Sequence, residues 1–98
     1  MKRYDPIILQ AISLWGADNQ IRQAGEECAE FAVKAFQHGR GRDVLDGLLE
    51  EGADVRLTGR AMDLILGEEA INAWVEIKAR RLQQRIIDFK AGTYKIIG

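Results

Sequence analysis

The sequence has no long apolar run, a single cysteine and almost no net charge. Crossing a bilayer takes roughly 20 consecutive apolar residues, so we expect no membrane-spanning segment. Cys28 has no second cysteine to pair with, which excludes an internal disulfide framework and is typical of the reducing cytoplasm. A formal net charge of −1 gives no basic excess for nucleic acid. Residues 1–6 carry no secretory signal pattern, so we expect a cytoplasmic protein.

What the sequence does contain indicates one small globular domain, residues 1–98. Its composition is 47% hydrophobic and 30% charged, which is typical of a soluble folded chain rather than a disordered one. A domain of this size buries a limited share of its surface, so self-association would add stability. Pro6 is the only proline, and no later residue interrupts helix formation in that way.

Four segments have apolar residues at helical spacing, and glycines separate them. Asp5 and Pro6 predict the first start, and the next two helices are expected to be capped by Asp18 or Asn19 and by Asp43. The expected stops are Gly16, Gly39, Gly67 and Gly92, with Gly59 as a possible earlier end of the third helix. The tail, residues 93–98, is predicted as a short strand or a packing arm. The pattern predicts an all-α, four-helix bundle-like fold with a short C-terminal tail.

Acidic residues gather on the two middle helices. The stretch "GEECAE" places Glu26, Glu27 and Glu30 within five positions. On the third helix, Glu51 lies within about 40° of the apolar stripe that contains Val44, so it is expected to point toward the core. A carboxylate in that position requires a partner, either a base or a cation.

The last predicted helix offers bases, since Lys78, Arg81 and Arg85 lie on or near its apolar stripe. Salt bridges to them would satisfy some of the acids, but not all. A hard divalent cation explains the cluster better, because Mg²⁺ prefers oxygen ligands and spaced carboxylates on facing helices can surround it. The periodicity does not choose between Glu26 and Glu27 as the inward residue. The acids concerned are Glu26, Glu27, Glu30, Glu51 and Asp54.

Two short motifs carry a resemblance to a known family. "EECAE" at 26–30 and "EGAD" at 51–54 have the form E-E-x-x-E followed by E-x-x-D. The chain thereby resembles the MazG-type nucleoside triphosphate pyrophosphohydrolases, a group of all-α NTP pyrophosphatases that also includes dimeric dUTPases and phosphoribosyl-ATP pyrophosphohydrolase. The similarity extends from about Trp15 to Arg85.

The resemblance implies an enzyme that hydrolyses (deoxy)nucleoside triphosphates to the monophosphate and pyrophosphate with Mg²⁺, or with Mn²⁺ in its place. Its implied metal ligands are Glu27, Glu30, Glu51 and Asp54. Glu26 would support them or deprotonate the attacking water. Lys78, Arg81 and Arg85 would contact phosphates. Independently of the resemblance, Trp15 and Trp74 most often indicate core positions, and each is also a candidate wall of a base-stacking pocket. A homodimer or homotetramer is expected, with no nucleic-acid or membrane partner.

Two alternatives stay open at this point. The same acids would serve an enzyme specific for dUTP or dCTP, or for phosphoribosyl-ATP, and the sequence does not separate these substrates. A non-catalytic helical interaction module would instead use the acids as a solvated charged face. Cys28 lies on the centre of its apolar stripe and is expected to be packed as a small hydrophobic residue.

Overall fold

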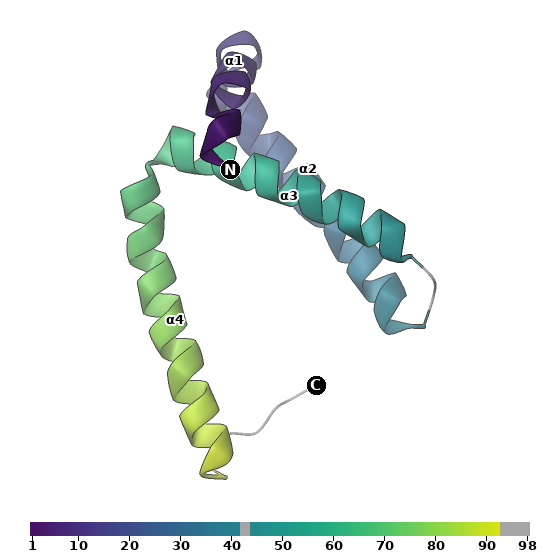
Figure 1. Ribbon diagram of the computed structural model, residues 1–98, viewed down its shortest axis with the longest axis vertical. Helices are drawn as coiled ribbons and strands as arrows, with labels where there is room; N and C mark the ends of the chain where they lie inside the picture. Colours follow the sequence, from purple (N-terminus) through teal and green to yellow (C-terminus); the bar gives the residue numbers. More distant parts are fainter. Residues whose placement is uncertain (42–43, 93–98) are drawn as a thin grey trace. The chain divides into compact units, whose positions relative to one another are not determined.

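The structure is a computed structural model that describes residues 1–41 and 44–92. These residues form a short 3₁₀ helix, η1 (Lys2–Tyr4), and the helices α1 (Asp5–Trp15), α2 (Ala17–Gly39), α3 (Leu45–Leu66) and α4 (Glu68–Lys90). No strand occurs among them, which confirms the predicted all-α, bundle-like fold (Figure 1). None of the described helices is long and apolar enough to cross a membrane.

The chain divides into two compact units, Met1–Gly67 and Glu68–Gly98, and each is described by itself. The prediction of one domain over residues 1–98 therefore stays a prediction. The second unit is built on α4, along which Ile71, Trp74, Val75 and Leu82 line one shallow apolar surface. Trp74 is 60% exposed, so this stripe is open to solvent in the described chain.

Glycines end the helices where the sequence predicts. Gly16, Gly67 and Gly92 have φ values of 89°, 101° and 78°, a left-handed conformation that L side chains rarely adopt. Gly59 does not break α3, which continues to Leu66. The predicted cap of α2 at Asp18 or Asn19 is wrong, since Gly16 is the N-cap. Position 43, where the next cap is predicted, and the tail 93–98 lie outside the described residues.

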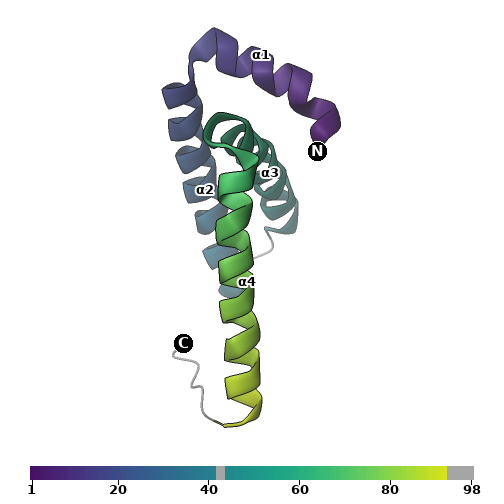
Figure 2. The same cartoon turned by 90° about the vertical axis from the view of Figure 1, so that its left-hand side faces the viewer.

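In the first unit, α2 and α3 lie side by side as an antiparallel hairpin, and α1 packs across α3 (Figures 1 and 2). Ile8 of α1 and Ala61 of α3 are the buried apolar residues at this crossing. Arg60, only 8% exposed, donates from Nε and Nη2 to the two carboxylate oxygens of Asp5, each over 2.8 Å. Asp5 was expected to cap α1, but Tyr4 is the N-cap and Asp5 instead ties α1 to α3.

Several polar side chains lie on the surface along which α2 meets α3. We call it the α2–α3 seam and define it by the contacts given below. Its residues are Gln20, Glu27, Phe31 and Lys34 of α2 and Gly47, Glu51, Gly52, Asp54 and Thr58 of α3. Of the predicted apolar stripe of α2, Phe31 lies in the seam and Ala24 and Ala32 are half-buried, whereas Ile21, Cys28 and Ala35 are exposed. The expectation that Cys28 is packed is therefore wrong.

Candidate functional site

Three carboxylates converge midway along the α2–α3 seam. Glu27, Glu51 and Asp54 each offer one oxygen, and these three oxygens lie within 4.8 Å of one another. All three residues are half-buried. They meet because Glu51 and Asp54 are three apart on α3 and so share a face that α2 packs against. Carboxylate oxygens at this spacing can hold a hard divalent cation such as Mg²⁺.

Two carboxylate oxygens of this cluster lack partners. Gln23 donates its amide N–H to Oε1 of Glu27 over 2.9 Å, which orients that carboxylate from one turn away on α2. Oε2 of Glu27 and Oε2 of Glu51 are buried and have no hydrogen-bond partner among the described residues. Buried polar oxygens are normally satisfied, so both call for a ligand that would coordinate them.

The electrostatics of the cluster favour the addition of positive charge. Burial raises the pKa of Glu51, and the charges of Glu30, Asp54 and Glu27 raise it further. Burial also raises the pKa of Asp54, followed by the charge of Glu27 and a hydrogen bond to it. Like charges in a partly desolvated site disfavour ionisation, and either a proton or a cation relieves that repulsion.

The other two predicted acids are not members of this trio. Glu30 is exposed, yet it lies near enough to Glu51 to raise its pKa by charge and by a hydrogen bond. Glu26 is exposed and is not part of the cluster. Of the two residues that the periodicity left open, Glu27 is thus the one that points into the seam.

Comparisons with known proteins leave the family unassigned. No family model, curated protein or solved structure matches the chain. The resemblance to the MazG-type enzymes therefore stays a prediction that rests on the two acidic motifs.

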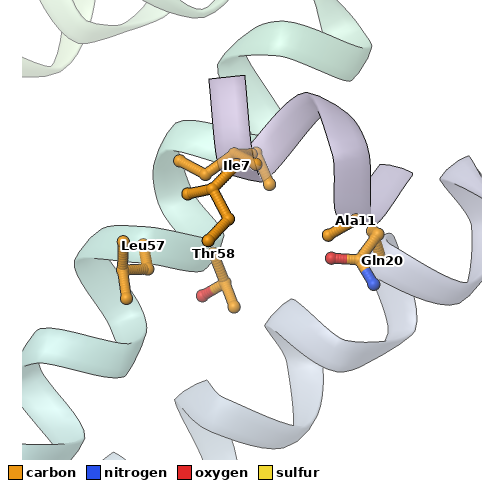
Figure 3. A pocket seen from close by; sticks show the side chains of 7 residues that line it. Ile7, Ala11, Gln20, Leu57 and Thr58 are labelled. Atoms are coloured by element: carbon orange, nitrogen blue, oxygen red, sulfur yellow. The ribbon is translucent and has the colours of Figure 1, made fainter. Parts of the chain in front are cut away.

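Figure 3 shows an apolar pocket, whose volume is about 270 Å³. Its lining residue Thr58 comes four residues, about one helical turn, after Asp54 on α3. Ile7 and Ala11 of α1 and Leu57 of α3 supply apolar walls, and Gln20 and Thr58 border it from α2 and α3. The hydroxyl of Thr58 donates to backbone carbonyls of its own helix, so its lone pairs stay available. The pocket pairs apolar walls with two polar groups, which is typical of small-molecule sites.

A lysine lies on the seam on the other side of the acids. The side chain of Lys34 crosses over Gly47, since a Cβ built on that glycine would lie 3.2 Å from Cε and 3.6 Å from Nζ. Lys34 is half-buried, and the described residues give it no ion pair or hydrogen bond. It is the only basic residue of the seam.

The remaining predicted substrate residues are on α1 and α4. Trp15 ends α1, is 65% exposed and is not a wall of the pocket in Figure 3. Lys78, Arg81 and Arg85 are exposed on α4, in the second unit. Sequence reasoning missed Gln20, Gln23, Lys34 and Thr58. The signal that could have found two of them is the seven-residue repeat of Gln20, Glu27 and Lys34, which places all three on one face of α2.

Proposed function

We propose that this protein is a Mg²⁺-dependent pyrophosphohydrolase that converts (deoxy)nucleoside triphosphates to the monophosphate and pyrophosphate. The observation that carries the proposal is the meeting of Glu27, Glu51 and Asp54 around two buried, unpartnered carboxylate oxygens. The two motifs that resemble the MazG-type enzymes contain these same three residues. A solvated charged face would leave its oxygens in water, so this observation favours the enzyme over the interaction module.

The residues present fit a divalent cation of the Mg²⁺ or Mn²⁺ type. Glu27, Glu51 and Asp54 would hold it, with Glu30 beside Glu51 as a further carboxylate. When bound, such an ion neutralises charge on the phosphate oxygens and lowers the pKa of bound water. No Ser, Cys or His nucleophile is required, because positioning and electrostatic stabilisation dominate phosphoryl chemistry.

The reaction balances with water alone as co-substrate. The water oxygen forms a bond to the α-phosphorus, and a carboxylate of the cluster accepts its proton. The bond between the α-phosphorus and the α–β bridging oxygen breaks, and its electron pair leaves with pyrophosphate. Glu26, which the resemblance gives a supporting or base role, is exposed beside the cluster.

A substrate panel tests this proposal. The protein is incubated with each (d)NTP, with dUTP and dCTP among them, and with phosphoribosyl-ATP, in Mg²⁺ or in EDTA. We expect monophosphate and pyrophosphate in Mg²⁺ only, and loss of turnover in Glu51→Gln. Release of orthophosphate alone, full activity in EDTA, or unchanged turnover in Glu51→Gln would contradict the assignment.

We further propose that the protein acts as a homo-oligomer through one apolar face of the α2–α3 hairpin. In each helix the apolar residues come one position after seam residues, as Cys28 follows Glu27 and Val55 follows Asp54. They are therefore rotated by about 100° from the seam, in the same sense along both helices. Because the helices are antiparallel, both stripes then lie on one side of the hairpin. This apolar face contains Ile21, Cys28 and Ala35 of α2 and Leu48, Val55 and Met62 of α3, with Leu45 at its outer edge and Glu51 at its edge toward the seam.

The size of this face suits a second copy of the chain. The 22 residues of α3 extend about 33 Å, and two packed helices are about 20 Å wide. Two such faces would bury roughly 1,200–1,300 Å², the lower end of stable interfaces. Leu45, at the edge of this face, is 55% exposed, and Leu48, Val55 and Met62 are half-buried.

Light scattering and sedimentation across a concentration series measure the association. We expect Leu45→Glu to weaken it, and Leu9→Glu, at a similarly exposed site of α1, to leave it intact. A monomer at all concentrations would refute the homo-oligomer.

A further inference from the structure

We propose that Lys34 binds the pyrophosphate end of the substrate, with the nucleotide lying along the α2–α3 seam from the apolar pocket to Gly47. This inference rests on the proposed function and gives the nucleotide a direction within the site. It assigns a role to a residue that neither acidic motif contains.

The first argument is the position of Lys34 relative to the acids. It lies seven residues from Glu27 and four from Glu30 on α2, so all three side chains leave neighbouring positions on the helix. Gly47, over which it crosses, lies four residues before Glu51 on α3. At 1.5 Å per residue, Gly47 therefore lies about 6 Å from Glu51 and about 10 Å from Asp54 along α3, and the end of Lys34 lies beside Gly47.

The second argument is that Lys34 has no partner among the described residues. No ion pair or hydrogen bond joins it to any residue of 1–41 or 44–92, and it is half-buried. The end of its side chain lies against Gly47, and its ammonium has no counter-charge among the described residues. An anion that spans the space between the metal ligands and Lys34 would supply that charge. A phosphate chain meets this need, since its oxygens bind lysine as a point charge.

The third argument is the order of groups along the seam. The pocket bordered by Gln20 and Thr58 comes first, the carboxylates come next, and Lys34 comes last. A nucleoside triphosphate has the same order: a flat ring, the α-phosphate at which water attacks, and the β- and γ-phosphates. With the α-phosphate at the acids and the ring in the apolar pocket, the leaving pyrophosphate lies toward Lys34.

The chemistry of the step gives Lys34 a defined effect. When the bond to the α–β bridging oxygen breaks, negative charge collects on the departing pyrophosphate. An ammonium beside that group stabilises this charge in the transition state as well as the bound product. A lysine whose methylene stem merely covers the seam would have neither effect.

The main experiment compares Lys34→Met and Lys34→Arg with the unsubstituted full-length protein. We expect Lys34→Met to lower kcat/KM for the preferred triphosphate about ten- to hundredfold, the range for a hydrogen bond to a charged group. Calorimetry in Mn²⁺ should show a similar loss of affinity for inorganic pyrophosphate but unchanged affinity for the nucleoside monophosphate. Affinity for Mn²⁺ alone should be unchanged or tighter, and Lys34→Arg should recover most of the pyrophosphate binding.

Gly47→Ala gives an independent test that leaves Lys34 in place. The new methyl group would press on the flexible end of Lys34, so the fold can accommodate it while the ammonium moves. Gly25→Ala is the matched control, because nothing lies within 4 Å of a Cβ built there. Both changes should raise the melting temperature through helix propensity. Only Gly47→Ala should weaken pyrophosphate binding.

The outcomes separate this inference from the proposed function. Turnover that is unchanged in Lys34→Met, or a loss that appears equally with the monophosphate, would overturn the role of Lys34 and leave the hydrolase standing. If no triphosphate is hydrolysed, the proposed function fails. Binding of Mn²⁺–pyrophosphate that depends on Lys34 would then still support the anion site, and binding independent of Lys34 would refute it.

Discussion

Replacing Glu51 with Gln should make the metal-free protein more stable while removing its response to divalent cations. The wild-type cluster holds three carboxylates whose nearest oxygens lie within 4.8 Å, and burial and like charge raise the pKa of Glu51. A neutral amide of nearly the same shape removes the repulsion without leaving a void. A variant that gains stability and loses cation binding is expected when a site is selected to bind a ligand rather than to stabilise the fold.

The size of the cation response follows from linkage. At a free Mg²⁺ or Mn²⁺ concentration about 100 times Kd, binding to the native state adds about 2.7 kcal/mol to the free energy of unfolding. For a chain of this length each kcal/mol raises the melting temperature by about 4–8 °C. The wild type should therefore melt roughly 10–20 °C higher with saturating cation than in EDTA, and Glu51→Gln should show little or no shift.

Differential scanning calorimetry in EDTA and in rising MnCl₂ measures both effects. Glu50→Gln is the matched control, because Glu50 is exposed beside Glu51 and lies outside the cluster. A variant that melts below the wild type in EDTA, or that keeps the full cation shift, would refute the reasoning. Equal shifts in all three proteins would point to non-specific cation binding.

Three further predictions concern stability. In EDTA, the raised pKa values of Glu51 and Asp54 mean that the folded state binds more protons than the unfolded chain. The contribution of these two groups to stability should therefore fall as pH rises above their ordinary pKa values of 4.5 and 3.8. Melting temperature against pH measures this loss, and saturating Mn²⁺ should offset it. Asp5→Asn should destabilise the protein by breaking the pair with Arg60, which holds the pKa of Asp5 below 3.8. The loss of stability relative to the wild type should be full above pH 3.8 and should shrink as pH falls through the lowered pKa. A loss of stability that is the same at every pH would contradict this prediction. Ile8→Ala should cost about 2–5 kcal/mol in urea unfolding, whereas Ile7→Ala, at a 65% exposed site, should cost far less.

Local signals in the sequence predicted the elements well. The glycines at 16, 67 and 92 end helices because each adopts a positive φ, a conformation that glycine adopts at low cost. Gly59 is not among the glycines with a positive φ, and α3 continues through it to Leu66. The inward direction of Glu51 was also predicted, because its position depends only on the rotation of its own helix.

Contacts between helices were predicted less well. Asp5 was expected to satisfy backbone N–H groups at the start of α1, but Arg60, 55 residues away, offers two charged donors at once. Cys28 was expected to be packed at the centre of its apolar stripe, yet it is exposed, while the neighbouring Glu27 meets the acids of α3. Periodicity reports which residues share a face and carries no information about what that face meets.

The sequence by itself determined four helices, their glycine ends and two acidic motifs, because helix formation and termination depend on residues within a few positions of one another. Only the tertiary structure decided that Glu27 rather than Glu26 meets Glu51 and Asp54, and that Lys34 lies over Gly47. Those pairings depend on the rotation and register of α2 against α3. The packing of whole helix surfaces sets both quantities, and no local sequence signal specifies them.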